Sequence, residues 1–361
     1  NAWPSLEHDM FGVIDRLGKF LPVGFYYKSL IRPKLLWKIA EPFIRRMAGL
    51  GKVNLKLEHS SEYSHRFLYT DIAVVGGGLA GLSAALEAAK AGADVTLVEE
   101  QPCLGGTLLY KAQDIDLPEF PGLSASEVAT TLAETVTLSS NVSVMTGASA
   151  IGLYEGNYLG VRKGNELVKL RAKQVIITTG SYQLPLVFDN NDLPGVMLGD
   201  AVRKLIHHYG VRPGNKAVVV TSDENGHSLA KDLTDAGVEV MAIADSRPRP
   251  DTESSGILDT PRIPVFWETS ISRALGKKHV RGADLIIGKE ADKHTDLLKL
   301  KCDLICISAN AQPANSLLHQ AGATMQFDNH IAQPLIRSTP AGLFAAGEVT
   351  GIRDGGNLSV L

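Results

Sequence analysis

Three glycines at a fixed spacing are the residues of this chain whose pattern points most directly to chemistry. They form the pattern Gly76-x-Gly78-x-x-Gly81, with Leu79 and Ala80 inside it. The first glycine of such a turn allows a sharp change of direction, the second lets the backbone approach a pyrophosphate, and the third lets a helix pack closely on a strand. A helix that starts there offers unpaired N–H groups and a partial positive charge to phosphate oxygens. The pattern therefore predicts a phosphate-binding turn.

The segments around this turn are those that such a site requires. Asp71–Val75 is apolar and β-branched, which predicts a buried strand leading into Gly76. Leu82–Ala91 is rich in alanine and predicts a helix, and Asp94–Val98 predicts the next strand. A lone glycine pattern is weak evidence, but this order of strand, turn, helix and strand predicts a Rossmann-type dinucleotide-binding fold.

An acidic residue follows the second predicted strand. Glu99 lies 23 residues after Gly76, which is the spacing of a carboxylate that accepts hydrogen bonds from the ribose hydroxyls. We expect Glu99 rather than its neighbour Glu100 to face the ribose, because Glu99 directly follows the strand. A carboxylate there repels a 2′-phosphate, so the site favours FAD, NAD or ATP over NADP.

Glycines recur beside other predicted strands, which we expect at Gln174–Thr178 and Leu343–Ala346. They complete the candidate cofactor-binding set with Gly105, Gly106, Thr107, Thr179, Gly180, Gly347 and Glu348. Together these segments resemble the flavoprotein superfamily with two dinucleotide-binding domains and a glutathione-reductase-like topology. The last motif of that superfamily ends in Gly-Asp, and the Asp holds the flavin ribityl chain. Glu348 is one methylene longer, a departure that counts against flavin at this position.

A second strand–helix–strand unit begins near Lys216. Its elements are expected at Ala217–Val220, Gly226–Ala236 and Val238–Ile243. Its turn lacks the glycine pattern and carries Asp223 and Glu224 where a pyrophosphate would lie. Like charges there oppose phosphate binding. We interpret this unit as a degenerate nucleotide-binding-like domain that does not bind NAD(P)H.

These patterns predict an α/β fold with an N-terminal arm and two Rossmann-like domains. The arm covers residues 1–66, the first domain is discontinuous (67–184 and 317–361), and the second, degenerate domain covers 185–316. Further elements are a helix near Ser124–Leu138, three short strands between Val142 and Leu170, and a buried strand at Leu304–Ile307.

The arm differs in composition from the rest of the chain. Up to Leu57, ten basic residues stand against four acidic ones, and large aromatic and aliphatic residues are interleaved with them. Pro22, Pro33 and Pro42 predict that no long amphipathic helix forms there. We interpret the arm as a strap that covers a subunit or another domain. The alternative is a membrane-surface helix.

The composition excludes several classes of function. A net charge of −3 over 361 residues gives no reason to expect nucleic acid, and no apolar run is long enough to span a membrane. Cys103, Cys302 and Cys306 show neither a disulfide framework nor metal-ligand spacing, so we expect buried free thiols, a reducing cytoplasmic compartment and no metal. We identify no catalytic acid, base or nucleophile, and interpret His207 and His208 as ordinary surface or core residues. Both ends of the sequence lead us to expect a piece of a longer polypeptide.

Beyond these motifs, nearly the whole chain resembles the α subunit of heterotetrameric sarcosine oxidase and of its relatives. The stretches that carry the resemblance are Asn1–Leu6, Pro22–Leu30 and Arg45–Gly51 in the arm, then Pro185–Met197, Gly237–Val240 and Asp245–Pro248. The resemblance implies NAD, or FAD, in the glycine-rich site. It also implies a β subunit whose FAD oxidises an N-methyl amine, an interface FMN that passes electrons to oxygen, and smaller subunits.

The resemblance further implies an N-terminal ferredoxin-like region and a C-terminal folate-binding region in the full α subunit. The related amino-acid dehydrogenases with two subunits share this section, so the substrate is less defined than the family. Two other functions remain open at this stage. One is a free-standing FAD-dependent NAD(P)H oxidoreductase, and the other is a non-catalytic, structural nucleotide-binding subunit.

Overall fold

The computed structural model describes residues 10, 34–47, 63–110, 120–250, 263–288, 296–309, 311–329 and 333–351. The chain divides into two compact parts, residues 1–61 and 62–361. Within residues 1–61, helix α3 (Lys34–Met47) continues through Pro42, so the expectation that Pro42 interrupts a helix here is wrong. A proline removes one i→i−4 hydrogen bond and kinks a helix at a cost of about 3 kcal/mol, and helical turns form on both sides of it. Pro22 and Pro33 lie outside the described residues.

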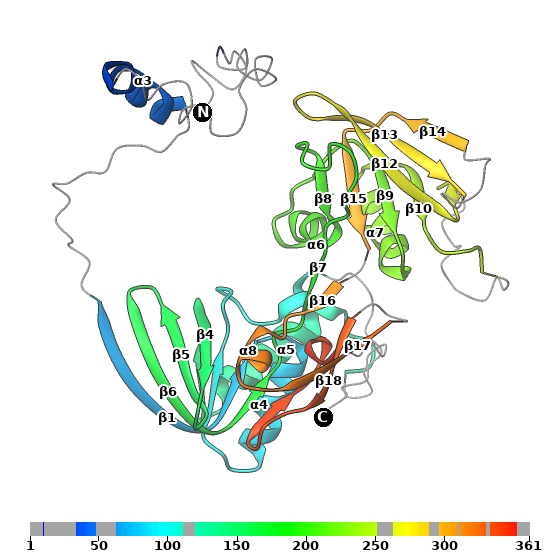
Figure 1. Ribbon diagram of the computed structural model, residues 1–361. Coiled ribbons are helices and arrows are strands. Elements are labelled where there is room, and N and C mark those ends of the chain that lie inside the picture. The colour runs from blue at the N-terminus through cyan, green and yellow to red at the C-terminus, as the bar shows by residue number, and fades with distance from the viewer. Residues whose placement is uncertain are drawn as a thin grey trace. The chain divides into compact units, whose positions relative to one another are not determined.

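Residues 62–361 contain a seven-stranded sheet, and several of its strands are labelled in Figure 1. Its parallel strands are, in order, β3 (Val142–Met145), β2 (Val95–Val98), β1 (Ser64–Val75), β6 (Glu166–Ile177) and β19 (Leu343–Ala345), with β19 paired to β6. Two antiparallel strands, β5 (Tyr158–Lys163) and β4 (Ala148–Tyr154), extend the sheet beyond β6. The carboxyl ends of the parallel strands share one edge, which is where α/β sheets bind their ligands.

Both faces of this sheet are covered along residues 72–75 of β1, which explains the continuous apolar run there. Val74 packs with Leu82 and Val128 beneath α4 (Leu79–Lys90) and α5 (Ala125–Leu138). Val75 faces the other way, into a core with β4 and β5. The short helix α8 (Ser316–Gln320) belongs to that second core.

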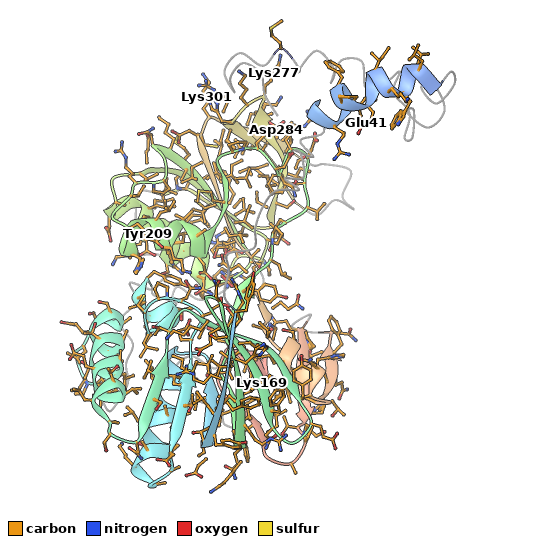
Figure 2. All side chains as sticks on the ribbon, turned by 90° about the vertical axis from the view of Figure 1, so that its left-hand side faces the viewer. Glu41, Lys169, Tyr209, Lys277, Asp284 and Lys301 are labelled. Atoms are coloured by element: carbon orange, nitrogen blue, oxygen red, sulfur yellow. The ribbon has the colours of Figure 1, made fainter. Side chains whose placement is uncertain are left out.

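A second sheet of five strands is parallel throughout. Its order is β11 (Val265–Phe266), β10 (Glu239–Asp245), β9 (Lys216–Thr221), β15 (Leu304–Ser308) and β8 (Val196–Leu198). One face packs on α7 (Glu224–Asp235), α6 (Gly199–Arg203) and the π-helical turn η4 (Lys204–His208). The other face packs on an antiparallel sheet of β12 (Thr269–Gly276), β13 (Val280–Ile287) and β14 (Asp296–Leu300). Figure 2 labels Tyr209, just after η4, and Lys277, in the β12–β13 turn.

Two short antiparallel pairs complete the unit, β7 (Ser181–Gln183) with β16 (Ala311–Pro313), and β17 (Thr324–Asp328) with β18 (Gln333–Ser338). The 3-10 helices η3 (Gly106–Leu109) and η6 (Glu348–Thr350) follow β2 and β19. Strands β7 and β16 carry the chain between the two large sheets. The domain boundaries at 184/185 and 316/317 fall next to this pair, and we retain them, like the arm boundary at 66, as a proposal.

The predicted strands and helices around both turns are confirmed, with two differences of extent. Strand β1 begins at Ser64, well before Asp71, and β6 joins the strand predicted at Gln174–Thr178 to the strand before it. The two strands pair along almost their whole length, and this long-range partner leaves no signal in the local sequence. None of the helices described is long and apolar enough to cross a bilayer.

Candidate functional site

The glycine turn joins β1 to α4, and each of its glycines has a separate steric role. Gly76 has φ of +110°, and a Cβ there would lie 2.4 Å from the carbonyl oxygen of Thr178. A Cβ on Gly81 would lie 1.8 Å from the carbonyl oxygen of Gly76, so α4 sits directly on the turn. A Cβ on Gly78, in contrast, would meet nothing closer than the Cα of Gly106 at 3.9 Å. The space in front of Gly78 is therefore open to a phosphate group.

The Glu99 carboxylate braces this turn from the end of β2. Its Oε2 accepts a hydrogen bond from the N–H of Gly77 at 2.6 Å, and its Oε1 accepts one from the N–H of Gln101 at 2.7 Å. Glu99 is buried, whereas Glu100 is exposed and accepts only a long hydrogen bond, 3.3 Å, from the Gln101 side chain. This geometry supports Glu99 as the ribose-facing acid, a role that stays a prediction.

Two further loops reach the same place. The N–H of Gly105 donates to the carbonyl of Gly77 at 2.8 Å, and a Cβ on Gly106 would lie 2.9 Å from the Cα of Gly78. A Cβ on Gly347 would lie 2.9 Å from the Cβ of Ala80. The loops after β2 and β19 thus meet the first turn of α4, where Leu79 packs into the α4–α5 core. Thr107 is the second residue of η3.

The predicted residues Thr179 and Gly180, just after β6, bond to the segment after β16 and not to the glycine turn. The hydroxyl of Thr179 donates to the carbonyl of Ala314 at 2.7 Å, and the N–H of Ala314 donates to Gly180. The next residue, Ser181, donates its hydroxyl proton to Glu348 at 2.6 Å. Glu348 stands where the flavoprotein superfamily has Asp, and Ser181 of β7 fixes its carboxylate.

Tyr110, at the end of η3, is a site residue that no motif in the sequence marks. Burial raises the pKa of its phenol well above the ordinary value, and the carboxylates of Asp200 and Glu348 raise it further. The ammonium of Lys204 lies 5.3 Å from the ring centroid. Tyr110 therefore lies within electrostatic range of Glu348, which stands where the flavoprotein superfamily has Asp. Only the fold brings these residues together.

The turn of the second unit repeats this framework with different residues. Thr221, Asp223 and Gly226 stand where the first unit has its three glycines. Gly226 keeps the packing role, because a Cβ there would lie 2.2 Å from the Cβ of Thr221. Asp223 instead caps α7, and its carboxylate accepts the N–H of Asn225 at 3.0 Å. The chain's own carboxylate therefore occupies the helix terminus at which a phosphate would bind.

Asp245 occupies the position that corresponds to Glu99. Asp245 pairs in register with Thr221. In the first unit, the pair of Val98 and Val75 comes directly before Glu99 and Gly76. Asp245 and Thr221 therefore correspond to Glu99 and Gly76. A β-bulge between Val240 and Ala242 absorbs the one extra residue of β10.

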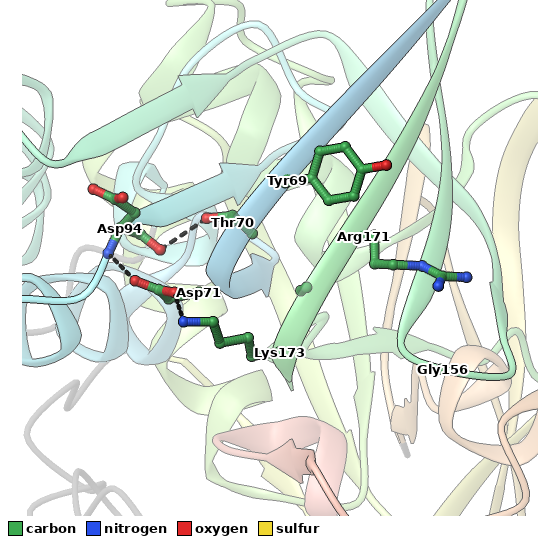
Figure 3. Close-up of a pocket in the computed structure, with 8 residues that line it drawn as sticks. Tyr69, Thr70, Asp71, Asp94, Gly156, Arg171 and Lys173 are labelled. Carbon is green, nitrogen blue, oxygen red and sulfur yellow. Dashed lines mark hydrogen bonds and ion pairs between the residues drawn. The ribbon is translucent and has the colours of Figure 1, made fainter.

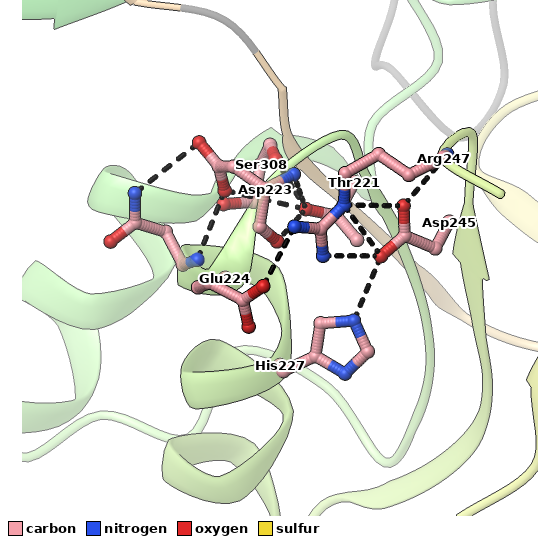
Figure 4. Close-up of polar contacts among 8 residues, drawn as sticks. Thr221, Asp223, Glu224, His227, Asp245, Arg247 and Ser308 are labelled. Carbon is pink, nitrogen blue, oxygen red and sulfur yellow. Dashed lines mark hydrogen bonds and ion pairs between the residues drawn. The ribbon is translucent and has the colours of Figure 1, made fainter. Parts of the chain in front are cut away.

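A closed polar network surrounds Asp245 (Figure 4). Its Oδ2 lies 2.8 Å from Nε2 of His227 and 2.7 Å from the Arg247 guanidinium, and Arg247 also contacts Glu224 at 2.7 Å. Burial opposes the ionised form of Asp245, but hydrogen bonds from His227 and Arg247 lower its pKa to about 2. A nucleotide would have to break this network, which supports the interpretation of a degenerate site.

The remaining candidates lie away from the glycine turn. His207 lies 3.4 Å from Asp232, the partner of the buried Arg203. Cys302 and Cys306 are buried free thiols, as expected, and burial raises the pKa of both, that of Cys302 to about 12. Cys103 is also a free thiol but is only partly buried, so the expectation of burial is wrong for this residue. Within the described residues no cluster of potential metal ligands occurs.

A hollow of about 410 Å³ lies beside the middle of β1, at Tyr69, Thr70 and Asp71 (Figure 3). It is lined by Tyr69, Thr70, Asp71, Asp94, Gly156, Arg171, Ala172 and Lys173. We do not assign the nucleotide to this hollow, because the glycine turn lies after Val75, at the carboxyl edge of the sheet.

Comparisons with known proteins agree with this geometry. Residues 70–358 match the family model described as pyridine nucleotide-disulphide oxidoreductase. The chain is 38% identical over 290 residues to the alpha subunit of sarcosine oxidase from Rhizobium meliloti (strain 1021), covering 76% of this chain and 29% of that protein. It is 24% identical over 319 residues to an opine oxidase subunit of Agrobacterium tumefaciens (strain Ach5), covering 79% of this chain and 62% of that one.

Among solved structures, thioredoxin reductase of T. acidophilum superposes with a TM-score of 0.63 at 20% identity, over 80% of this chain and 92% of that one. These findings confirm the predicted α/β fold with two dinucleotide-binding-type domains and the resemblance to the sarcosine oxidase α subunit. The chain spans less than a third of the length of the Rhizobium protein.

Gly78 and Gly81 allow a matched test of the turn. We expect Gly78→Val to abolish nucleotide binding and leave the fold intact, because its side chain enters open space reserved for phosphate. Gly81→Ala should instead destabilise the fold by roughly 1–3 kcal/mol or more, since its Cβ strikes backbone. Nucleotide content and urea unfolding of both variants check this. A folded Gly78→Val chain with normal nucleotide content would refute the site.

Glu99→Gln should weaken nucleotide binding by roughly 1–3 kcal/mol, because a charged acceptor is lost while the side-chain shape is kept. Glu100→Gln, at the exposed neighbouring position, should leave affinity unchanged. Calorimetric titration of the nucleotide-stripped chain measures both. Equal affinities for the two variants would show that another residue holds the ribose.

Asp245→Asn should destabilise the chain by about 2–3 kcal/mol at pH 7, since it leaves Arg247 and His227 facing an amide. The folded pKa of Asp245 lies below its unfolded value, so its contribution is present above about pH 4 and is lost as the pH falls towards 2. Urea unfolding at pH 7 and pH 3 should show the difference shrinking. Glu239→Gln, which breaks an exposed pair with Lys216, is the control and should cost at most about 1 kcal/mol.

Proposed function

The chain belongs to the pyridine nucleotide-disulphide oxidoreductase family, and from this premise we propose that it is the nucleotide-binding core of a sarcosine oxidase-like α subunit. In this proposal the chain is part of a multi-subunit flavoenzyme that oxidises sarcosine or a similar secondary amino acid and passes electrons to oxygen. The relatives named as the alpha subunit of sarcosine oxidase and as a subunit of opine oxidase support it, because both names denote one subunit of a larger oxidase.

The observation that carries the proposal is the contrast between the two turns. The first unit keeps an open approach at Gly78 and a braced acid at Glu99, which fits a dinucleotide such as NAD or FAD. The second unit has Asp223 and the Arg247 network at the corresponding positions. A free-standing NAD(P)H oxidoreductase needs a second nucleotide site, so this contrast disfavours that function.

We infer that the nucleotide of the first unit stays bound while amine oxidation takes place on another chain. A bound NAD would supply hydride transfer, and a bound FAD would supply hydride or electron transfer. The residues of this chain hold it: Glu99 orients the ribose and the first turn of α4 faces the pyrophosphate. By the family resemblance, an FMN would lie between this chain and a β subunit, and that subunit would hold FAD.

The disulphide chemistry of the family name does not extend to the described cysteines of the second unit's core. Cys302 and Cys306 lie in that core, and burial raises the pKa of both thiols. The thiolate is the form that attacks a disulfide. These two residues are therefore structural in our proposal.

The test is to release the bound nucleotide from the purified chain, identify it by mass spectrometry, and assay the same chain alone. We expect near-stoichiometric NAD or FAD, no turnover of NADH or NADPH with artificial acceptors, and sarcosine oxidation only in the presence of a flavin-carrying second polypeptide. Rapid NAD(P)H turnover by a yellow chain on its own would favour the reductase instead. An empty glycine site in the folded chain would contradict the proposal as a whole.

A further inference from the structure

The outer face of the long β1–β6 ribbon exposes aromatic and cationic side chains together. Phe67 and Tyr69 on β1 are 62% and 78% exposed. In β6, Val168, Leu170 and Ala172 are buried. Since side chains alternate along a strand, Lys169 and Arg171 lie on the opposite, outer face. Their register partners are Phe67 and Tyr69, and the Lys169 ammonium lies 4.9 Å from the Phe67 ring centroid.

Strands β5 and β4 continue the same face. Tyr158 is the register partner of Arg171, and Tyr154 is the partner of Tyr158, with ring centroids 5.7 Å apart. Tyr154 is 51% exposed and Ile151, which covers Gly160, is 57% exposed. We call this surface, formed by Phe67, Tyr69, Ile151, Tyr154, Tyr158, Lys169 and Arg171, the ribbon face. Figure 2 labels Lys169 on it. Monomers rarely expose so many large side chains side by side, and Tyr and Arg are enriched in the centres of interfaces.

The hollow of about 410 Å³ lies at the end of the ribbon face, between Tyr69, Arg171 and Gly156 (Figure 3). Such a hollow accepts an anchoring side chain of a bound protein. Before Thr70, the edge of β1 that faces away from β6 has no strand partner among the described residues, because its pairing with β2 begins only at Ile72. Unpaired strand edges are normally covered in native proteins.

The charge of the ribbon face identifies the kind of occupant. Its nearby acids Asp71 and Glu166 are already paired, with Lys173 and Arg66. Within the described parts of the chain, Lys169, Arg171 and Arg162 have no carboxylate at ion-pair distance. Two further acids lie at the edge of the ribbon face, Glu155 in the β4–β5 turn and Asp94, which lines the hollow. The chain's own arm has an excess of basic residues, so its charge opposes binding here.

We propose that the ribbon face is the docking surface for an acidic, aromatic-bearing surface of another subunit of the enzyme. This inference rests on the proposed function in one respect, namely that the chain works in an assembly of several subunits. Acidic side chains of the partner pair with Lys169 and Arg171, and an aromatic or apolar side chain enters the hollow beside Tyr69. The glycine turn follows the carboxyl end of β1, beyond Val75, and takes no part in this contact.

The test is zero-length carbodiimide cross-linking of the assembly purified from its source cells by a tag on the full chain. We expect Lys169 to be joined to Asp or Glu of a second polypeptide, whereas Lys277, an exposed lysine of the β12–β13 turn (Figure 2), is not. The double variant Lys169→Glu, Arg171→Glu should reduce the co-purifying subunit roughly tenfold or more, since like charges then meet. Lys277→Glu is the control and should retain it.

The outcomes separate this inference from the proposed function. Lys169 joined to the arm, to a second copy of the chain, or to nothing, in an assembly that contains a second subunit, overturns the docking surface alone. Absence of any stoichiometric second polypeptide overturns both. Nucleotide content and far-ultraviolet circular dichroism of the double variant should match the unmodified chain, so loss of the partner cannot be attributed to unfolding.

Discussion

The contact between the first turn of α4 and the end of β1 is the constraint on which the nucleotide site depends. The helix lies so close that a single methyl group on Gly81 would overlap the Gly76 carbonyl. This closeness aims the N-terminus of α4 at the carboxyl edge of the sheet. Thr178 fixes the turn from β6 through its hydroxyl, which donates to the Gly76 carbonyl at 2.9 Å, and Glu99 fixes it from β2. Three neighbouring strands thereby hold one loop.

The second unit shows that helix packing and phosphate binding are separable. Gly226 retains the close approach of α7 to β9, so the strand–helix–strand framework survives. The glycine that admits phosphate is replaced by Asp223, and the acid that would meet ribose is buried against Arg247. Close helix packing thus requires the glycine at position 226 even in a turn that is not shaped to bind phosphate.

Local sequence predicted the parts of the structure that local chemistry decides. The glycine turn, its flanking elements and the position of Glu99 follow from spacing and periodicity alone. The pair of Tyr110 and Glu348 could not be predicted, because their positions are 238 residues apart and meet only through the order of β1, β6 and β19 in the sheet. The bulge in β10 was equally hidden, since only register with β9 reveals it. Pro42 shows the reverse error. The rule that a proline interrupts a helix was applied there, but the other residues of the 14-residue helix α3 outweigh its effect.

The distribution of charge links these observations to the way such a chain can work. Arg247 pairs with both Asp245 and Glu224 inside the second unit, and the His227 ring contacts Asp245 at hydrogen-bond distance. Because these groups satisfy one another, the second unit has little electrostatic attraction left for a nucleotide at that edge. Cations that no acid matches remain on the outer face of the first sheet, beside exposed aromatic rings, within the described part of the chain. In our proposals, cofactor retention then uses the carboxyl end of β1 and partner binding uses its middle, so that one strand connects the two sites.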